Sequence, residues 1–206
     1  MHQNREPNRH PKAKASWSLP LRPPPTGIPR TLGDLMATAE YMADHSLRKD
    51  GKFHPTLLLL GNQGPLILHP DNLNDDQAKD VFLTTARLLC IAQAATSVVM
   101  ALEAWAKFPK PGEPFNPQEM PSESMERKEV VILVGESRGQ AMQKCLPIVR
   151  TDTGGYFGFG EDPLPKGVSV GGRFAQLLPP LPPTAKQQHR ALASLKQMGF
   201  KPPPSS

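Results

Sequence analysis

Apolar residues recur every three or four positions from Ala78 onward, which is the pattern of an amphipathic helix. Asn74 is placed to cap its first turn, with Gln77 reaching back, and Asp75 and Asp76 add negative charge where the helix dipole favours it. A helix with one apolar face must bury that face, so we expect it to lie across a sheet. The expected buried face comprises Ala78, Val81, Phe82, Thr85, Leu88, Leu89, Ala92 and Ala95.

Five further runs have the apolar or alternating pattern of strands. The first is a hairpin, because two leucine-rich strands flank a Gly-Asn-Gln-Gly turn, and pairing Leu60 with Pro65 sets its register. Pro147 cannot donate a ladder hydrogen bond, which predicts an edge position or a bulge for its strand. The runs are 55–69 (the hairpin), 97–108, 129–135, 141–150 and 156–161.

Two other helices have clear start signals. Thr31 and Asp34 predict a capping box at the beginning of a helix that ends near Leu47, and Thr184 with Gln187 predicts the same for a C-terminal helix that Gly199 ends. Together the elements predict an α+β fold, a small antiparallel sheet with the long amphipathic helix packed on one face, flanked by Pro-rich basic tails.

Proline and charge divide the chain into three parts. Residues 1–30 and 179–206 hold seven prolines each of a total of 25. Residues 1–30 have a charge balance of +5 and residues 184–206 of +4, whereas residues 31–183 are at −4. We therefore expect a disordered basic tail over 1–30, a single α+β domain over 31–178, and a Pro-rich linker with a short basic helix over 179–206.

The basic ends carry the candidate partner-binding residues. A lone aromatic in a polar tail can anchor the tail to a partner, and exposed cations suit an anionic surface. We predict a non-enzymatic accessory protein that binds a partner macromolecule through these ends, with a protein partner favoured. A nucleic-acid-binding protein that uses the tails as phosphate contacts is the alternative. The tails can equally be solubilising ends that bind nothing, or ends that fold back on the acidic body. The residues are Trp17, Arg22, Lys186, Arg190 and Lys196.

One group of residues suits a metal ion. In the hairpin register His54 faces Asp71 and stands diagonal to His69, so two imidazoles and a carboxylate share one end of the sheet. This set would serve a metal-dependent hydrolase. The plainer interpretation is a polar rim where the strands leave the sheet, and we expect neither catalysis nor a cofactor.

Cysteine usage and hydropathy bound the location. Two cysteines, Cys90 and Cys145, indicate a reducing compartment rather than a disulfide scaffold. No run of about 18 apolar residues occurs and the basic N-terminus has no apolar core after it, so we expect a cytoplasmic protein without a membrane partner.

Overall fold

The turn at Asn62 and Gln63 fixes the register of the first two strands. Leu60 pairs with Pro65 and Gly61 with Gly64, as predicted. The computed structural model describes residues 23–70, 73–108, 124–164 and 173–200. In chain order the elements are α1 (Leu32–Asp50), β1 (Thr56–Gly61), β2 (Gly64–Leu68), α2 (Asp76–Ala92), β3 (Ser97–Ala106), β4 (Lys128–Ser137), β5 (Gln140–Arg150), β6 (Tyr156–Phe159) and α3 (Ala185–Gln197).

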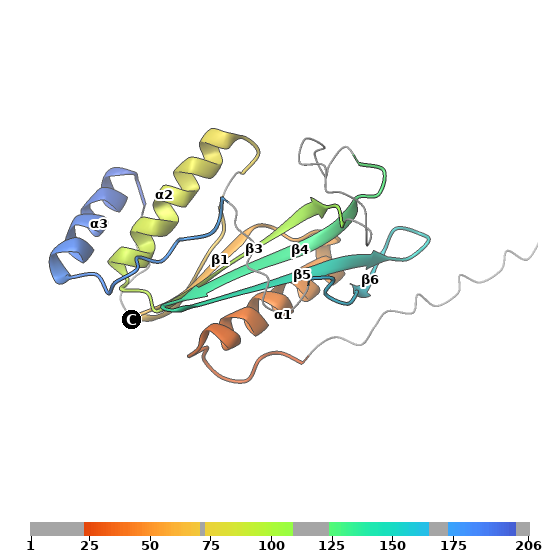
Figure 1. Cartoon of the computed structure of the whole chain (residues 1–206), viewed down its shortest axis with the longest axis horizontal. Coiled ribbons are helices and arrows are strands. Elements are labelled where there is room, and N and C mark those ends of the chain that lie inside the picture. Colours follow the sequence, from red (N-terminus) through yellow and green to blue (C-terminus); the bar gives the residue numbers. More distant parts are fainter. Residues whose placement is uncertain (1–22, 71–72, 109–123, 165–172, 201–206) are drawn as a thin grey trace, which may run out of the picture.

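The strands of the described residues form one curled antiparallel sheet in the order β2-β1-β3-β4-β5-β6 (Figure 1). Each neighbouring pair is antiparallel, and β3 and β4 have the longest register, from Ser97↔Ser137 to Ala106↔Lys128. The fold is therefore mixed α+β, as the sequence predicted. None of the helices in the described ranges combines the length and apolar character needed to span a membrane.

Helices cover both faces of the sheet, which corrects the expectation of one long helix on one face. Leu58, Val99 and Leu133 belong to a core with α1, whereas Leu57 and Met100 belong to a second core with α2 and α3. Because neighbouring residues of a strand point to opposite faces, α1 and α2 lie on opposite sides. The prediction of a single covered face overlooked the pattern of β1 and β3. Their nearly continuous apolar runs are typical of strands that are buried on both faces.

The start and the buried face of α2 differ in detail from the prediction. Asp75, not Asn74, is the N-cap, and its side chain accepts a hydrogen bond from the Ala78 N–H at 2.7 Å. Phe82 and Leu89 are buried as expected, but Val81 is 53% exposed. Val81 instead lines an open groove between α2 and β2.

The position of Pro147 is only partly what the sequence predicted. Its strand β5 is not at the edge, because β6 follows it. The Pro147 carbonyl accepts from the Gly160 N–H at 2.8 Å, so the missing proline N–H faces the side of β6. The pairing of β6 with β5 is limited to Ile148–Arg150 and is irregular after Val149, so the absent donor falls just outside the paired stretch.

The first helix is longer than predicted and buries two acids. The capping box of Thr31 and Asp34 is present, but the helix continues through Asp50 to a C-cap at Gly51, where φ is +70°. Glu40 and Asp44 are 5% and 2% exposed on its buried side. Both have charged or polar partners from the sheet or from α1 itself, as described below, which is what burial of a carboxylate requires.

Candidate functional site

The helix α3 presents a basic face to solvent. Lys186, Arg190 and Lys196 are all exposed, and the helix contains no acidic residue. Within the described part of the chain, none of the three forms an ion pair. The face is therefore available to an anionic surface.

Apolar packing and caps at both ends fix α3 on α2. Ala191 and Leu195 are 3% and 2% exposed and belong to the core shared with α2. Thr184 and Gln187 form the predicted capping box, and the Phe200 N–H donates to the Leu195 carbonyl beyond the last turn. The helix thus has one packed side and one basic side.

The segment before α3 is anchored by a carboxylate from the sheet. Glu136 on β4 accepts hydrogen bonds from the backbone N–H groups of Gln176, Leu177 and Leu178. Leu177 is 2% exposed in the same core as α2. This anchor orders the approach to α3 independently of the packing of the helix itself.

Two of the predicted partner-binding residues cannot be placed. Trp17 and Arg22 lie outside the described residues. The candidate basic surface therefore rests on Lys186, Arg190 and Lys196.

The predicted metal site can be placed only in part. His54 and His69 are exposed, whereas Asp71 lies outside the described residues. The Thr56 hydroxyl donates to the His54 carbonyl at 2.8 Å and lies 3.1 Å from His69 Nδ1. The donor in the second contact depends on the tautomer of the imidazole. Among the described residues, no group of three His, Cys, Asp or Glu side chains could hold a metal ion, so the metal site stays a hypothesis.

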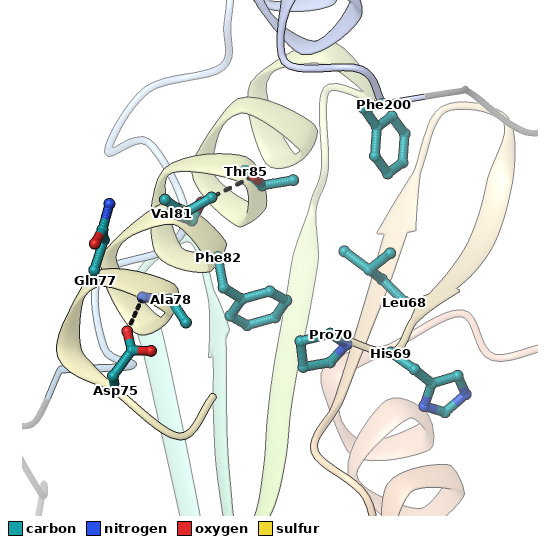
Figure 2. Close-up of a pocket in the computed structure, with 10 residues that line it drawn as sticks. All are labelled: Leu68, His69, Pro70, Asp75, Gln77, Ala78, Val81, Phe82, Thr85 and Phe200. Carbon is teal, nitrogen blue, oxygen red and sulfur yellow. Dashed lines mark hydrogen bonds between the residues drawn. The ribbon is translucent and has the colours of Figure 1, made fainter. Parts of the chain in front are cut away.

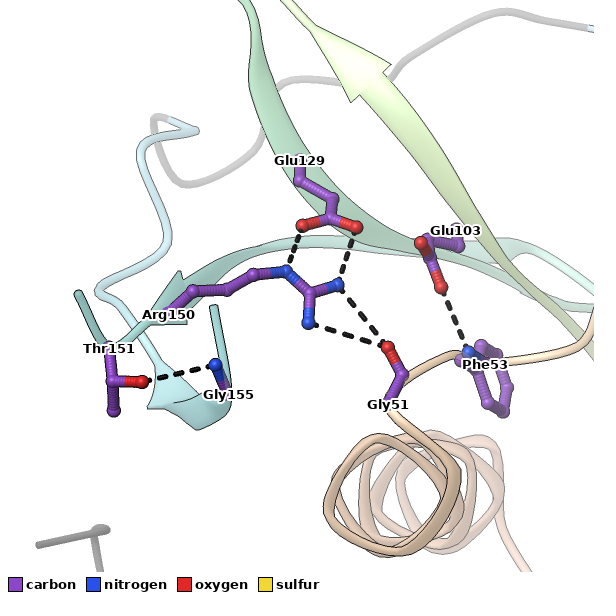
Figure 3. A network of polar contacts seen from close by, with 7 residues as sticks. All are labelled: Gly51, Phe53, Glu103, Glu129, Arg150, Thr151 and Gly155. Atoms are coloured by element: carbon purple, nitrogen blue, oxygen red, sulfur yellow. Dashed lines mark hydrogen bonds and ion pairs between the residues drawn. The ribbon is translucent and has the colours of Figure 1, made fainter. Parts of the chain in front are cut away.

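A carboxyl pair and an arginine link the sheet to the end of α1 (Figure 3). Arg150 contacts Glu129 through Nε–Oε2 and Nη2–Oε1, both at 2.6 Å, and its guanidinium also donates to the Gly51 carbonyl at 3.3 and 3.4 Å. The Glu103 carboxyl accepts from the Phe53 N–H at 2.9 Å. Phe53 and Gly51 follow α1, so the network holds the end of that helix on β3, β4 and β5.

The two carboxyl groups of this network have different proton affinities. Burial raises the pKa of Glu103, and the neighbouring Glu129 carboxyl raises it further, although the Phe53 N–H opposes both. The Arg150 guanidinium lowers the pKa of Glu129. Glu129 is therefore the more acidic of the two carboxyl groups, and Glu103 is the first of them to take up a proton as the pH falls.

A second polar cluster lies nearer the middle of α1, at Glu40 and Asp44. The buried Asp44 carboxylate binds Arg48 Nε at 3.0 Å and accepts from the Tyr156 hydroxyl at 2.7 Å. Glu40 binds Lys144 Nζ at 2.8 Å. Each buried acid thus has a partner that neutralises its charge, which makes a structural role sufficient for both.

An apolar groove of about 470 Å³ lies between α2 and the edge strand β2 (Figure 2). Phe200 stands at one end, and Pro70 and Asp75 lie toward the other. The ring of His69 is turned away from Phe82 and the middle of the groove. Its lining is Leu68, His69, Pro70, Asp75, Gln77, Ala78, Val81, Phe82, Thr85 and Phe200.

The two cysteines are buried free thiols. Cys90 and Cys145 are buried and are not joined by a disulfide. Burial raises the pKa of Cys90 to about 12 and that of Cys145 to about 11. Neither thiol is ionised near neutral pH, so neither is a good nucleophile.

Comparison of the chain with models of protein families, with curated proteins and with solved structures gives a clear result. No match is found in any of the three. The function is therefore inferred from the surfaces described above.

Proposed function

We propose that this protein is a non-enzymatic accessory protein that binds a partner macromolecule with an acidic surface, and that α3 and the basic ends of the chain make the contact. The observation that carries the proposal is the exposed basic face of α3. A protein partner is preferred because the helix is rigidly docked and offers a fixed arrangement of charges.

The arrangement of α3 supports binding in two ways. Its apolar side is occupied by α2, so the basic side is presented in one orientation and little conformational entropy is lost on binding. The body between the ends has an excess of acidic residues, so the positive potential is concentrated at the ends. Such a distribution favours encounter with an anionic partner in a defined orientation.

Phosphate contacts are the alternative use of the same cations. A nucleic acid would be bound with an affinity that falls steeply with salt, because counterions are released from the phosphates. The metal-dependent hydrolase built on His54, His69 and Asp71 has less support, since the two histidines are exposed and one of them is held by Thr56.

The test is binding of defined anionic probes to the full chain, measured by fluorescence anisotropy at low and raised salt. The probes are a labelled glutamate-rich peptide and random-sequence duplex and single-stranded nucleic acids. The variant Lys186→Gln/Arg190→Gln/Lys196→Gln is compared with Lys49→Gln/Lys52→Gln/Lys128→Gln, which removes the same charge from exposed lysines elsewhere.

We expect the first variant to bind the peptide about tenfold more weakly, because three surface charge contacts contribute about 0.5 kcal/mol each. The control variant should bind like the unmodified chain. Equal weakening by both variants, or no binding of the peptide at low salt, would contradict the proposal. Stronger binding of nucleic acid than of the peptide, lost in the first variant only, would select the alternative.

A further inference from the structure

Among the described residues, no strand pairs with the outer edge of β2, which leaves the backbone groups of Ile67 without a ladder partner there. The Leu60 carbonyl accepts from the Thr96 N–H at 2.8 Å and therefore faces β3. Because backbone groups alternate in direction along a strand, Leu59 and Gly61 face β2, and their partners Leu66 and Gly64 face back. Ile67 consequently directs both its N–H and its C=O away from the sheet.

Apolar side chains are exposed on both sides of this edge. Ile67 is 49% exposed on the α1 side of the sheet, and Val81 is 53% exposed at the groove on the α2 side. The groove itself is mostly apolar and runs beside β2 (Figure 2). An edge strand with unpaired backbone groups and apolar flanks is a template for another strand.

Prolines restrict the stretch that can pair. Pro65 also lies at the outward-facing register, where its lack of an N–H removes one donor from the edge. If the alternation of backbone direction continues past Leu68, the His69 N–H also points outward. Pro70 comes next in the chain and has no N–H, so it limits the stretch that can pair. The available outward groups are thus the Pro65 carbonyl, both groups of Ile67 and the N–H of His69.

We propose that the occupant of this edge is a second copy of the chain, which adds its own β2 antiparallel with Ile67 opposite the partner's Ile67. In this register the two Ile67 residues exchange N–H···O=C bonds, and each His69 N–H meets the carbonyl of the partner's Pro65. The donor that Pro65 lacks is not needed for these four bonds.

A second copy fits better than an unrelated strand because the pattern is self-complementary. The donors and acceptors match about a two-fold axis at Ile67, and the exposed Ile67 side chains become cross-strand neighbours on the α1 face. On the other face, Leu66 and Leu68 lie beside the partner's Leu68 and Leu66 and extend the apolar cover of the groove. The two sheets join into one, twice as wide as the sheet in Figure 1.

Self-association goes beyond the proposed function and does not depend on it. It places two copies of α3 in one assembly, which would strengthen binding to a partner with repeated acidic sites. The contact between the two copies involves few residues, so its buried area is small. We therefore expect weak association, with a Kd of about micromolar or above.

Cysteine cross-linking of the full chain tests the register directly. Cα atoms of a hydrogen-bonded antiparallel pair are about 5.5 Å apart, within the range of a disulfide. Ile67→Cys should therefore give a covalent dimer under mild oxidation. Gln63→Cys, at the exposed hairpin tip, is the control, because the two Cα atoms would be about 27 Å apart in this register. The native cysteines are buried and should not interfere.

Light scattering with size-exclusion chromatography provides the second readout. The mass of the unmodified chain should rise from 22.5 kDa toward twice that value as the concentration increases from about 1 µM to about 1 mM. Ile67→Pro removes the outward N–H and Ile67→Lys adds a charge to the edge, so both variants should remain monomeric with unchanged circular dichroism. The variant of α3 should dimerise normally, which separates this test from that of the proposed function. A constant 22.5 kDa throughout, or equal cross-linking of the two cysteine variants, would overturn the proposal.

Discussion

Arg150 on β5 and Glu129 on β4 form a two-point ion pair in which both contacts are 2.6 Å long (Figure 3). The same guanidinium donates to the Gly51 carbonyl at the end of α1. One side chain thus joins two strands and a helix end. Neither partner is near the other in the sequence, so the contact depends on the register of β4 with β5.

Replacement of this arginine by lysine should destabilise the fold. Arg150→Lys keeps the charge but cannot make both contacts with Glu129 and reach Gly51, because an ammonium lacks the planar fork of a guanidinium. We expect the free energy of unfolding in urea to fall by about 1–2 kcal/mol. Arg173→Lys is the matched control, since Arg173 pairs with an Asp76 side chain that is 77% exposed, and it should leave the stability nearly unchanged because solvent screens an exposed ion pair.

Removing the charge of Glu103 should stabilise the protein at neutral pH but not at about pH 4. The pKa of Glu103 is raised by burial and by Glu129. A group with a raised folded-state pKa favours folding below its unfolded pKa, about 4.3, and that contribution is lost as the pH rises through the folded value. Glu103→Gln removes this loss and keeps an acceptor for the Phe53 N–H.

Thermal melting at two pH values measures this effect. At pH 7 we expect the melting temperature of Glu103→Gln to lie about 2–4 °C above that of the unmodified chain. The rise is small because Glu103 is partly exposed and solvent screens its charge. At pH 4 the two should melt at nearly the same temperature. A difference that is independent of pH would contradict the assignment of the raised pKa to Glu103.

Close contact between α1 and β4 at Gly135 should make this glycine hard to replace. A Cβ added there would lie 2.8 Å from Met36 Sδ and 2.9 Å from Leu32 Cδ1. Gly135→Val must therefore displace the buried Met36 and Leu32 side chains of α1 and should lower the free energy of unfolding by about 1–3 kcal/mol. Gly160→Ala, where the nearest atom is Pro147 Cβ at 3.4 Å, should have little effect. Similar losses in the two variants would show that α1 does not pack closely at Gly135.

The docking of α3 can be tested by truncation of its core residue. Leu195 is 2% exposed between α3 and α2, so Leu195→Ala should cost about 2–4 kcal/mol. It should also speed limited proteolysis within residues 179–200 if α3 leaves α2 before the rest unfolds. Met198→Ala, at a side chain that is 45% exposed, is the control and should behave like the unmodified chain.

Local sequence signals predicted the elements well. The capping residues at Thr31 and Thr184, the Gly61–Gly64 turn and the apolar run at 130–134 specify their structures through interactions with near neighbours. These signals need no knowledge of the tertiary fold. The N-cap of α2 shows the limit of such signals, since it is Asp75 and not the predicted Asn74. Both residues can cap a helix, so the local sequence does not decide at which of the two the helix begins.

Features made by distant residues were not predictable. The ion pair of Arg150 with Glu129 and the burial of Asp44 depend on how α1 lies on the sheet. The groove needs β2, α2 and Phe200, whose approach no single pattern encodes. The exposure of Val81 was also not predicted, because the residue shares the apolar face of the helix with Phe82. Periodicity alone does not distinguish a residue at the margin of an apolar face from one at its centre.

The most direct test of the central claim, that α3 is a docked helix whose basic face receives a partner, is amide hydrogen exchange of the full chain with and without the glutamate-rich peptide. The account predicts slowed exchange in residues 185–197, beyond the protection that the helix has alone, and no such slowing in Lys186→Gln/Arg190→Gln/Lys196→Gln. Protection confined to other elements, or equal in the variant, would contradict it.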